Sequence, residues 1–406
     1  MSTTDAPVAP GDRYDSLDVL RGLAVLMIFT VNVRNMLGPM NTMFDPAYFT
    51  GRYDLAIDRV LQYAVDGKWI ATFAILFGAG LMLLHEKAVA AGTDSRERIV
   101  SRQKWLLAFG LAHLFLIWPG DVLTTYAVMG FLAMLFLHRR SGTVAVWAVL
   151  LLAFSVGTLF LVGAAMGFMP EEAATEMVSD FATDLAEEEE IMRGGSVAGH
   201  LLFRLEFGLQ MLLNSLFMGW MVLGYMLLGI LLYRTGFLLA RWGVLPYLAT
   251  AAICLPVAWG VDTLRVEGSG IWDGTATEPY ILSFFATMWM GTLDGLFGAL
   301  GYAALVNLAV RLGLKARPLA AAGRMAFTNY IMCSLIGTTM AYGHAGGRLG
   351  QVTLAEAMGL VAIVWLGILV VSPLWLSVFR YGPLEWLWRS LSYGERQPFL
   401  KRNETV

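Results

Sequence analysis

Several ionisable and amide side chains stand inside or at the ends of long apolar runs in this sequence of 406 residues. A charged group at membrane depth costs free energy, so it usually pairs with another group or faces a watery cavity. Asp18 and Arg21 begin the first apolar run, three residues apart and therefore on one helical face. They either neutralise each other as an ion pair or leave the Arg21 guanidinium to bind a phosphate, which its fork of N–H donors suits.

A second pair, His113 and Asp121, has the chemistry of proton transfer. His113 lies within an apolar run, and Asp121 follows the turn at Trp118–Gly120. If their helices lean together, the carboxylate orients an imidazole that acts as a general base. The alternative is a neutral, buried histidine that fills space and is satisfied by one neighbour. The spacing leaves both interpretations open.

Asn32 and Lys68 lie farther from the predicted cytoplasmic side. Asn32 follows Arg21 by eleven residues, about three helical turns, so the two side chains occupy one side of the helix at different depths. This spacing favours a wet pocket beside the first helix, with an amide hydrogen bond to another helix as the alternative. Lys68 either extends its ammonium group to the membrane surface or contributes to an anion site.

Two further arginines, Arg324 and Arg389, fall on the same predicted side of the membrane as Arg21. Together the three guanidinium groups would form a cationic mouth for the diphosphate of coenzyme A or another anionic headgroup. Glu385 and Arg389 stand four residues apart. The alternative is therefore an ion pair that only stabilises a helix at the membrane surface.

Composition predicts the elements that position these residues. Hydrophobic residues make up 57% of the chain and charged residues 15%, whereas a soluble domain has about 25% charged residues. Apolar runs of about 20 residues, enough to cross a bilayer as a helix, recur along the chain. We therefore predict an all-α, polytopic membrane protein, and exclude nucleic-acid binding. Both cysteines lie in apolar runs and no metal-site spacing is present, so we expect no metal.

The apolar runs predict ten spanning helices. They lie at 17–38, 66–86, 102–119, 121–138, 142–168, 208–233, 243–262, 282–310, 319–342 and 355–379. With the N-terminus inside, 20 of the 28 Lys and Arg residues fall on the inner side. This bias agrees with the positive-inside rule and predicts that both termini are cytoplasmic.

The predicted helices divide the chain into five regions. These are a cytoplasmic tail at 1–16, a five-helix half at 17–168, an acidic outer loop at 169–207, a second five-helix half at 208–379, and a cytoplasmic interfacial helix and tail at 380–406. Residues 39–65 mix aromatic and charged side chains, which is typical of an interfacial helix or a lid. Residues 170–193 are strongly acidic, which favours a solvated helix; a funnel for cations is the alternative.

Five motifs, in this order, resemble the YeiB family of bacterial inner-membrane proteins. They are SLDVLRGLAVLMIFTVN, DGKWIATFAILFGAGL, HLFLIWPGDVLTTYAVMGFL, GRMAFTNYIMCSLI and YGPLEWLWRSLSYG. The resemblance runs from about Ser16 to Pro398 and implies a multi-pass protein of the bacterial inner (plasma) membrane.

The first motif also resembles that of transmembrane acyltransferases such as heparan-alpha-glucosaminide N-acetyltransferase. Asp18, Arg21 and Gly22 match its opening, and Asn32 matches the asparagine of its first helix. That family carries a catalytic histidine in the next outer loop, whereas residues 33–84 here contain none. The resemblance therefore implies either that His113 takes over as the base or that the chemistry differs.

Taken together, these features favour a membrane-embedded acyltransferase that uses a cytoplasmic acyl-CoA. His113 and Asp121 would be base and orienter, and Asn32 would polarise the thioester carbonyl. The expected donor site comprises Asp18, Arg21, Lys68, Arg324 and Arg389, and the expected substrate site comprises Tyr126, Asn329 and Tyr330. Expected partners are membrane lipids and a small-molecule or lipid-linked acceptor, with a homodimer left open. The alternatives are a transporter of a small amphipathic metabolite and a lipid-binding or assembly protein without turnover.

Overall fold

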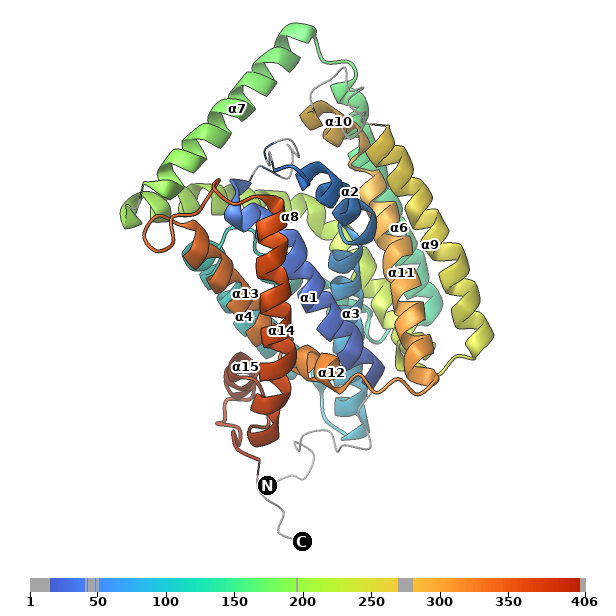
Figure 1. Ribbon diagram of the computed structural model, residues 1–406. Coiled ribbons are helices and arrows are strands. Elements are labelled where there is room, and N and C mark those ends of the chain that lie inside the picture. The colour runs from blue at the N-terminus through green and yellow to red at the C-terminus, as the bar shows by residue number, and fades with distance from the viewer. Residues whose placement is uncertain are drawn as a thin grey trace.

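The computed structural model describes residues 15–40, 42, 48, 51–194, 196–268 and 280–401. Within these ranges the chain is helical, and its extended pairing is an isolated antiparallel bridge between Phe379 and Leu400. Figure 1 shows one bundle in which α1 runs through the centre. This confirms the predicted all-α class.

The helices follow one another along the chain with short connections. They are α1 (Asp15–Leu37), α2 (Asp54–Ala64), α3 (Lys68–Ala90), α4 (Ser95–Ala112), η5 (His113–Ile117), α5 (Leu123–Ala133), η6 (Met134–Phe136), α6 (Ser141–Met166), α7 (Glu171–Arg193), α8 (Val197–Arg234), η7 (Phe237–Leu239), α9 (Val244–Glu267), α10 (Tyr280–Thr287), α11 (Met290–Arg311), α12 (Arg317–Arg324), α13 (Ala326–Ala341), α14 (Leu354–Val378) and α15 (Pro383–Tyr393).

Among the described residues, seven helices are long and apolar enough to cross a membrane, or up to eight if α12 and α13 form one bent span. All ten predicted spans fall on helices, but the count of ten is not confirmed. The stretch predicted at 102–119 begins within a helix whose first half is charged, and the stretch at 121–138 corresponds to the short helices α5 and η6. The stretch at 282–310 is divided between α10 and α11.

Helices α1 and α12 approach each other closely near the start of α1. A Cβ atom on Gly22 would overlap the carbonyl oxygen of Leu319, and a Cβ atom on Gly323 would overlap that of Asp18. Glycine at both positions therefore lets the two backbones touch. This contact gives the glycine of the Asp18–Gly22 motif a structural reason.

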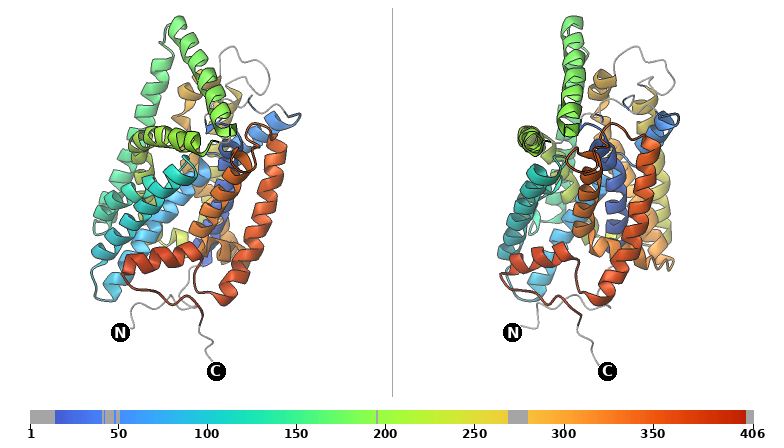
Figure 2. Two further views of the ribbon diagram at one scale, coloured as in Figure 1. Left: turned by 90° about the vertical axis from the view of Figure 1, so that its left-hand side faces the viewer. Right: turned by 60° about the vertical axis from the view of Figure 1, so that its left-hand side comes forward.

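The chain bends by 81° between α12 and α13. As a result α12 lies across the lower end of the bundle in Figure 1, while α13 continues upward beside α1. Figure 2 shows α15 packed across the same end, near the beginning of α4. The start of α1 and the end of α15 therefore lie at one end of the molecule, which agrees with termini on one side of the membrane.

The opposite end carries the acidic segment as a single helix, α7, which projects from the bundle (Figures 1 and 2). Most of its side chains are exposed, which confirms the prediction of a solvated helix for 170–193. Its last turns return to the bundle, where the Glu188 carboxylate accepts a hydrogen bond from the Met40 backbone at 2.7 Å. Of the segment predicted as an interfacial helix or lid at 39–65, α2 is described, whereas residues 41, 43–47, 49 and 50 lie outside the described residues.

Candidate functional site

A cavity of about 500 Å³ lies at the end of the bundle that carries α12 and α15. Its wall is formed by side chains from α1, α3, α4, α5, α12, α13 and α15, which are far apart in the sequence. The inner wall is apolar and aromatic. Its side chains include Phe73, Leu76, Phe77, Leu106, Tyr126, Phe327 and Tyr330.

Positive charge dominates the polar part of this wall. Seven cationic and two acidic side chains line it within the described chain. They are Arg21, Lys87, Arg98, Arg102, Arg324, Arg380 and Arg389, with Asp18 and Glu385. Because the cations outnumber the carboxylates by five, the cavity has the electrostatics of a site for a polyanion. An apolar chamber behind such a rim suits a ligand with a phosphorylated head and an apolar part.

Aromatic rings hold several of these guanidinium groups. Arg102 lies over the Trp388 ring at 4.0 Å, and Arg389 lies over the Tyr393 ring at 4.8 Å. A guanidinium that stacks by its flat face keeps its N–H edge for an anion. Arg21 pairs instead with Asp18 at 3.0 Å, so the predicted ion pair is confirmed, and both residues also line the cavity.

Glu385 does not form the ion pair with Arg389 that the spacing offers as one of two interpretations. Its Oε1 accepts hydrogen bonds from the backbone N–H groups of Phe327 at 2.7 Å and Thr328 at 3.0 Å, and its Oε2 accepts one from Thr328 Oγ1 at 2.5 Å. The carboxylate thus caps the N-terminus of α13, where free N–H groups attract negative charge. Burial raises the pKa of Glu385, which these hydrogen bonds partly oppose.

The predicted contact between His113 and Asp121 is present. His113 Nδ1 is 2.9 Å from Asp121 Oδ1, and Asp121 Oδ2 accepts a hydrogen bond from the Thr124 backbone at 2.7 Å. The chain makes this possible because α4 continues into the short π-helix η5 and then turns back before α5. Such π-helical turns are frequent at functional sites.

The second ring nitrogen of His113, Nε2, is the atom that could accept a proton. His113 is 1% exposed, and its Nε2 has no hydrogen-bond partner among the described residues. An imidazole oriented by a carboxylate through one nitrogen has the other available to take a proton. Tyr330 connects this pair to the cavity, because it lines the cavity wall and its ring centre lies 5.1 Å from that of His113.

Of the predicted site residues, six line the cavity. They are Asp18, Arg21, Tyr126, Arg324, Tyr330 and Arg389. The other five do not: His113 and Asp121 contact the lining through Tyr330, and three residues lie elsewhere. Asn32 is outside the cavity lining, and the Asn329 amide donates to the Ala322 carbonyl at 3.1 Å and to Ser372 Oγ at 3.2 Å, so it joins helices. Lys68 lies in a separate buried ionic cluster near the opposite end of the bundle.

Four cationic residues of the cavity were not among the predicted site residues. They are Lys87, Arg98, Arg102 and Arg380. All four are among the 20 Lys and Arg residues that the sequence places on the inner side of the membrane, which by itself assigns them no site. A signal was present in the run SRERIVSRQK, which places Arg98 and Arg102 four residues apart on one face of α4.

The fold and this cavity define a multi-pass helical membrane protein with a cation-rich cavity at one end. The model of the family described as "Protein of unknown function (DUF418)" matches residues 232–395. This match, together with similarity to two relatives over nearly the whole chain, supports assignment to the YeiB family. The matched region includes Arg324, Tyr330 and Arg389, whereas Asp18 and Arg21 precede it.

Similarity to the relatives extends over nearly the whole chain. "Uncharacterized protein YxaH" of Bacillus subtilis (strain 168) is 29% identical over 407 residues, which cover 98% of each chain. "Uncharacterized protein YeiB" of Escherichia coli (strain K12) is 29% identical over 400 residues, which cover 96% of this chain and 99% of that protein. Both the N-terminal and C-terminal parts of the cavity therefore lie within the shared length.

Proposed function

We propose that this protein is a membrane-embedded acyltransferase whose cavity binds a cytoplasmic acyl-CoA. The observation that carries the proposal is the excess of five cations on a cavity that is apolar deeper inside. Coenzyme A carries a diphosphate and a further phosphate, and the guanidinium fork is suited to each. The apolar inner wall would receive the acyl chain, and Tyr330 would bring the thioester near the His113–Asp121 pair.

The proposed reaction uses His113 as the base. The acceptor hydroxyl or amine gives its proton to His113 Nε2 as its oxygen or nitrogen bonds to the thioester carbonyl carbon. The carbon–sulfur bond then breaks, and the imidazolium returns the proton to the thiolate of CoA. Asp121 keeps Nε2 as the reactive nitrogen and stabilises the imidazolium. Like Asn32, His113 and Asp121 do not themselves line the cavity, so the proposed reaction relies on Tyr330 to link the pair to it, and Asn32 is assigned no step.

The proposal includes a topology. The protein would cross the bacterial inner membrane ten times, with α4–η5 and α5–η6 as spans, and both termini would be cytoplasmic. The cationic cavity end would then face the cytoplasm, where acyl-CoA is made, and α7 would face outward. The inner-side excess of Lys and Arg supports this orientation. The acceptor would be a small or lipid-linked molecule that reaches the site from the membrane or the outer side.

Calorimetric titration of the purified protein with CoA and with a long-chain acyl-CoA tests the proposal. Arg21→Ala is expected to weaken binding by about 1.5–3 kcal/mol, because a charge-assisted phosphate contact is lost. Arg193→Ala is the matched control, since Arg193 lies on α7 and pairs with Glu189. Failure of the wild-type protein to bind either molecule would exclude the acyl-CoA assignment.

The bend between α12 and α13 favours one alternative, transport of an amphipathic anion. Broken helices form substrate sites in many transporters, and here the break follows Arg324, which lines the cavity. Proteoliposomes supplied with labelled acyl-CoA distinguish the two functions. Acyl transfer predicts labelled acylated product and free CoA, whereas transport predicts movement of an unchanged anion across the bilayer.

A further inference from the structure

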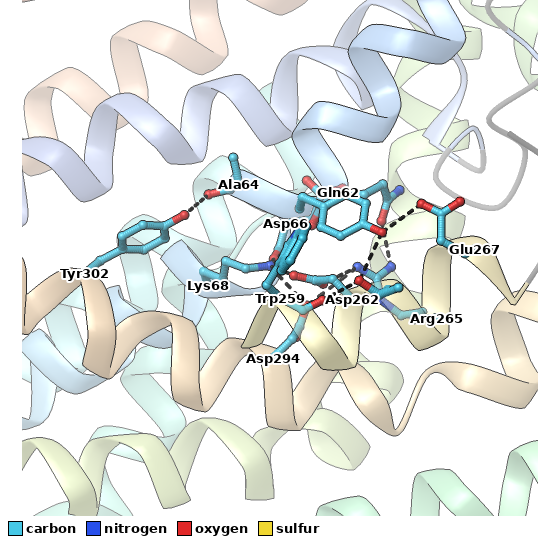
Figure 3. A network of polar contacts seen from close by, with 12 residues as sticks. Gln62, Ala64, Asp66, Lys68, Trp259, Asp262, Arg265, Glu267, Asp294 and Tyr302 are labelled. Carbon is cyan, nitrogen blue, oxygen red and sulfur yellow. Dashed lines mark hydrogen bonds and ion pairs between the residues drawn. The ribbon is translucent and has the colours of Figure 1, made fainter. Parts of the chain in front are cut away.

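A cluster of buried ionisable side chains joins the start of α3, the end of α9 and the start of α11, and Figure 3 shows it from close by. Lys68 begins α3, Asp262 and Arg265 lie near the end of α9, and Asp294 lies near the start of α11. The Lys68 side chain is 3% exposed and both aspartate side chains are 0% exposed. Three separate helices therefore bring four charged groups together away from water.

Each cation of this cluster contacts both carboxyl groups. Lys68 Nζ lies 2.8 Å from Asp262 Oδ2 and 3.3 Å from Asp294 Oδ2. The Arg265 guanidinium lies 3.0 Å from Asp262 Oδ1 and 3.6 Å from Asp294 Oδ2. The two aspartates are thus drawn to the same two cations, which holds their carboxyl groups close to each other.

Asp294 Oδ1 is buried and has no hydrogen-bond partner among the described residues. An ionised carboxylate can only accept hydrogen bonds, so neither aspartate can donate to the other unless one of them carries a proton. Because the same two cations hold both carboxyl groups, a proton shared between these groups would supply the donor that Asp294 Oδ1 lacks.

The charges beside the cluster make such a proton favourable. Arg34 of α1 pairs with Asp58 at 2.7 Å and with Asp66 at 2.6 Å, so this triad carries one excess negative charge when all three groups are ionised. Lys68 Nζ is 3.3 Å from the backbone oxygen of Asp66, which places the triad next to the cluster. With one proton on the Asp262–Asp294 pair, the seven ionisable groups sum to zero. A net buried charge would be costly in a low-dielectric interior.

The other groups around the cluster leave this balance unchanged. Gln62 of α2 accepts a hydrogen bond from Arg265 at 2.6 Å. The hydroxyl groups of Tyr225 and Tyr302 donate to backbone oxygens, so they are neutral. Toward the surface, Arg59 and Glu267 form an ion pair at 2.5 Å, and Tyr63 donates to the same carboxylate at 2.8 Å.

We propose that Asp262 and Asp294 form a proton-binding site inside the membrane part of the protein. The site holds one exchangeable proton between the two carboxyl groups and releases it as pH rises. Release leaves one uncompensated negative charge over the seven groups of the cluster and the adjacent triad, so protonation is coupled to how the helices that carry these groups pack. The site is independent of the proposed acyl transfer.

Infrared difference spectroscopy of the full-length protein tests this site. The wild-type protein should show the carbonyl stretch of a buried protonated carboxyl group, which shifts in D₂O and disappears reversibly as pH is raised. Asp294→Asn and Asp262→Asn should each remove it. Asp121→Asn should retain it, because Asp121 is a buried carboxylate that already has two donors.

Three outcomes would overturn the proposal. They are the absence of this band in the wild-type protein, its persistence in both aspartate variants, and its loss on addition of Na⁺ at constant pH, which would indicate cation exchange instead. Wild-type protein labelled with ¹³C-aspartate provides a second measurement if a variant does not fold. An unshifted band would then belong to another residue type and would contradict the assignment.

Discussion

The two ends of the bundle differ in how many carboxylate partners their cationic side chains have. At the α12–α15 end, seven cations share a cavity with two carboxylates, and aromatic rings support several of the guanidinium groups. At the other end, Lys68 and Arg265 each contact both Asp262 and Asp294. The first region is short of negative charge, while the second is satisfied within the chain.

The cavity end is therefore suited to bind an anion from outside the chain, whereas the cations of the buried cluster are neutralised by aspartates of the chain itself. A cation held by an aromatic face keeps its hydrogen-bond donors for another molecule. A cation enclosed by two carboxylates has no such capacity, and its removal leaves those carboxylates buried and uncompensated. Substitution of a cation should therefore mainly reduce anion affinity at the cavity end and mainly reduce stability at the other end.

The largest expected effect concerns the His113–Asp121 pair behind the cavity. His113→Gln keeps much of the side-chain volume and hydrogen-bonding capacity but cannot act as a base near neutral pH. We expect normal thermal stability and an acyl-transfer rate that falls roughly 10²–10⁴-fold. A stable variant with full activity would remove His113 from the mechanism, and loss of stability with activity retained per folded molecule would make the histidine structural.

A matched pair of lysine variants tests the comparison directly. Lys68→Met should destabilise the protein by about 3–5 kcal/mol, because it leaves two buried carboxyl groups without their ammonium partner. Lys87→Met should change stability by less than about 0.5 kcal/mol, because Lys87 is an exposed residue at the cavity rim. Denaturant unfolding and CoA titration of both variants provide the measurements. CoA affinity should fall in Lys87→Met, and equal stability of the two variants would contradict the proposed difference.

Much of the cavity was predictable because its residues belong to regular local patterns. Asp18 and Arg21 share one helical face, and a carboxylate eight residues after His113 can return to it when the chain reverses between the two. The positive-inside bias placed Arg324 and Arg389 on the side of Arg21 without any knowledge of packing. These inferences needed only the period of a helix and the side of the membrane.

The buried cluster was not predictable in the same way, because its partners are distant in sequence. Lys68 and Asp294 are separated by 226 residues. The local spacing of Asp262 and Arg265, three residues apart, indicates only their own pair on α9. Which helices pack together is a tertiary property, so the pairing of Lys68 with α9 and α11 does not follow from spacing. The same reason explains Glu385, where a partner four residues away was expected but the N-terminus of α13 is the actual one.

The smallest expected effect concerns Glu385, one of the two acids of the cavity. Glu385→Gln removes a negative charge near the proposed phosphate site, so CoA should bind about 0.5 kcal/mol more tightly at neutral pH, or roughly twofold. Burial raises the pKa of Glu385. As pH falls through this raised pKa, wild-type Glu385 becomes neutral, and its affinity should approach that of the variant. The affinity of Glu385→Gln should not change with pH in this range. Glu176→Gln, on the exposed helix α7, should behave like the wild-type protein. Weaker CoA binding by Glu385→Gln would instead mean that capping of α13 matters more than the cavity charge.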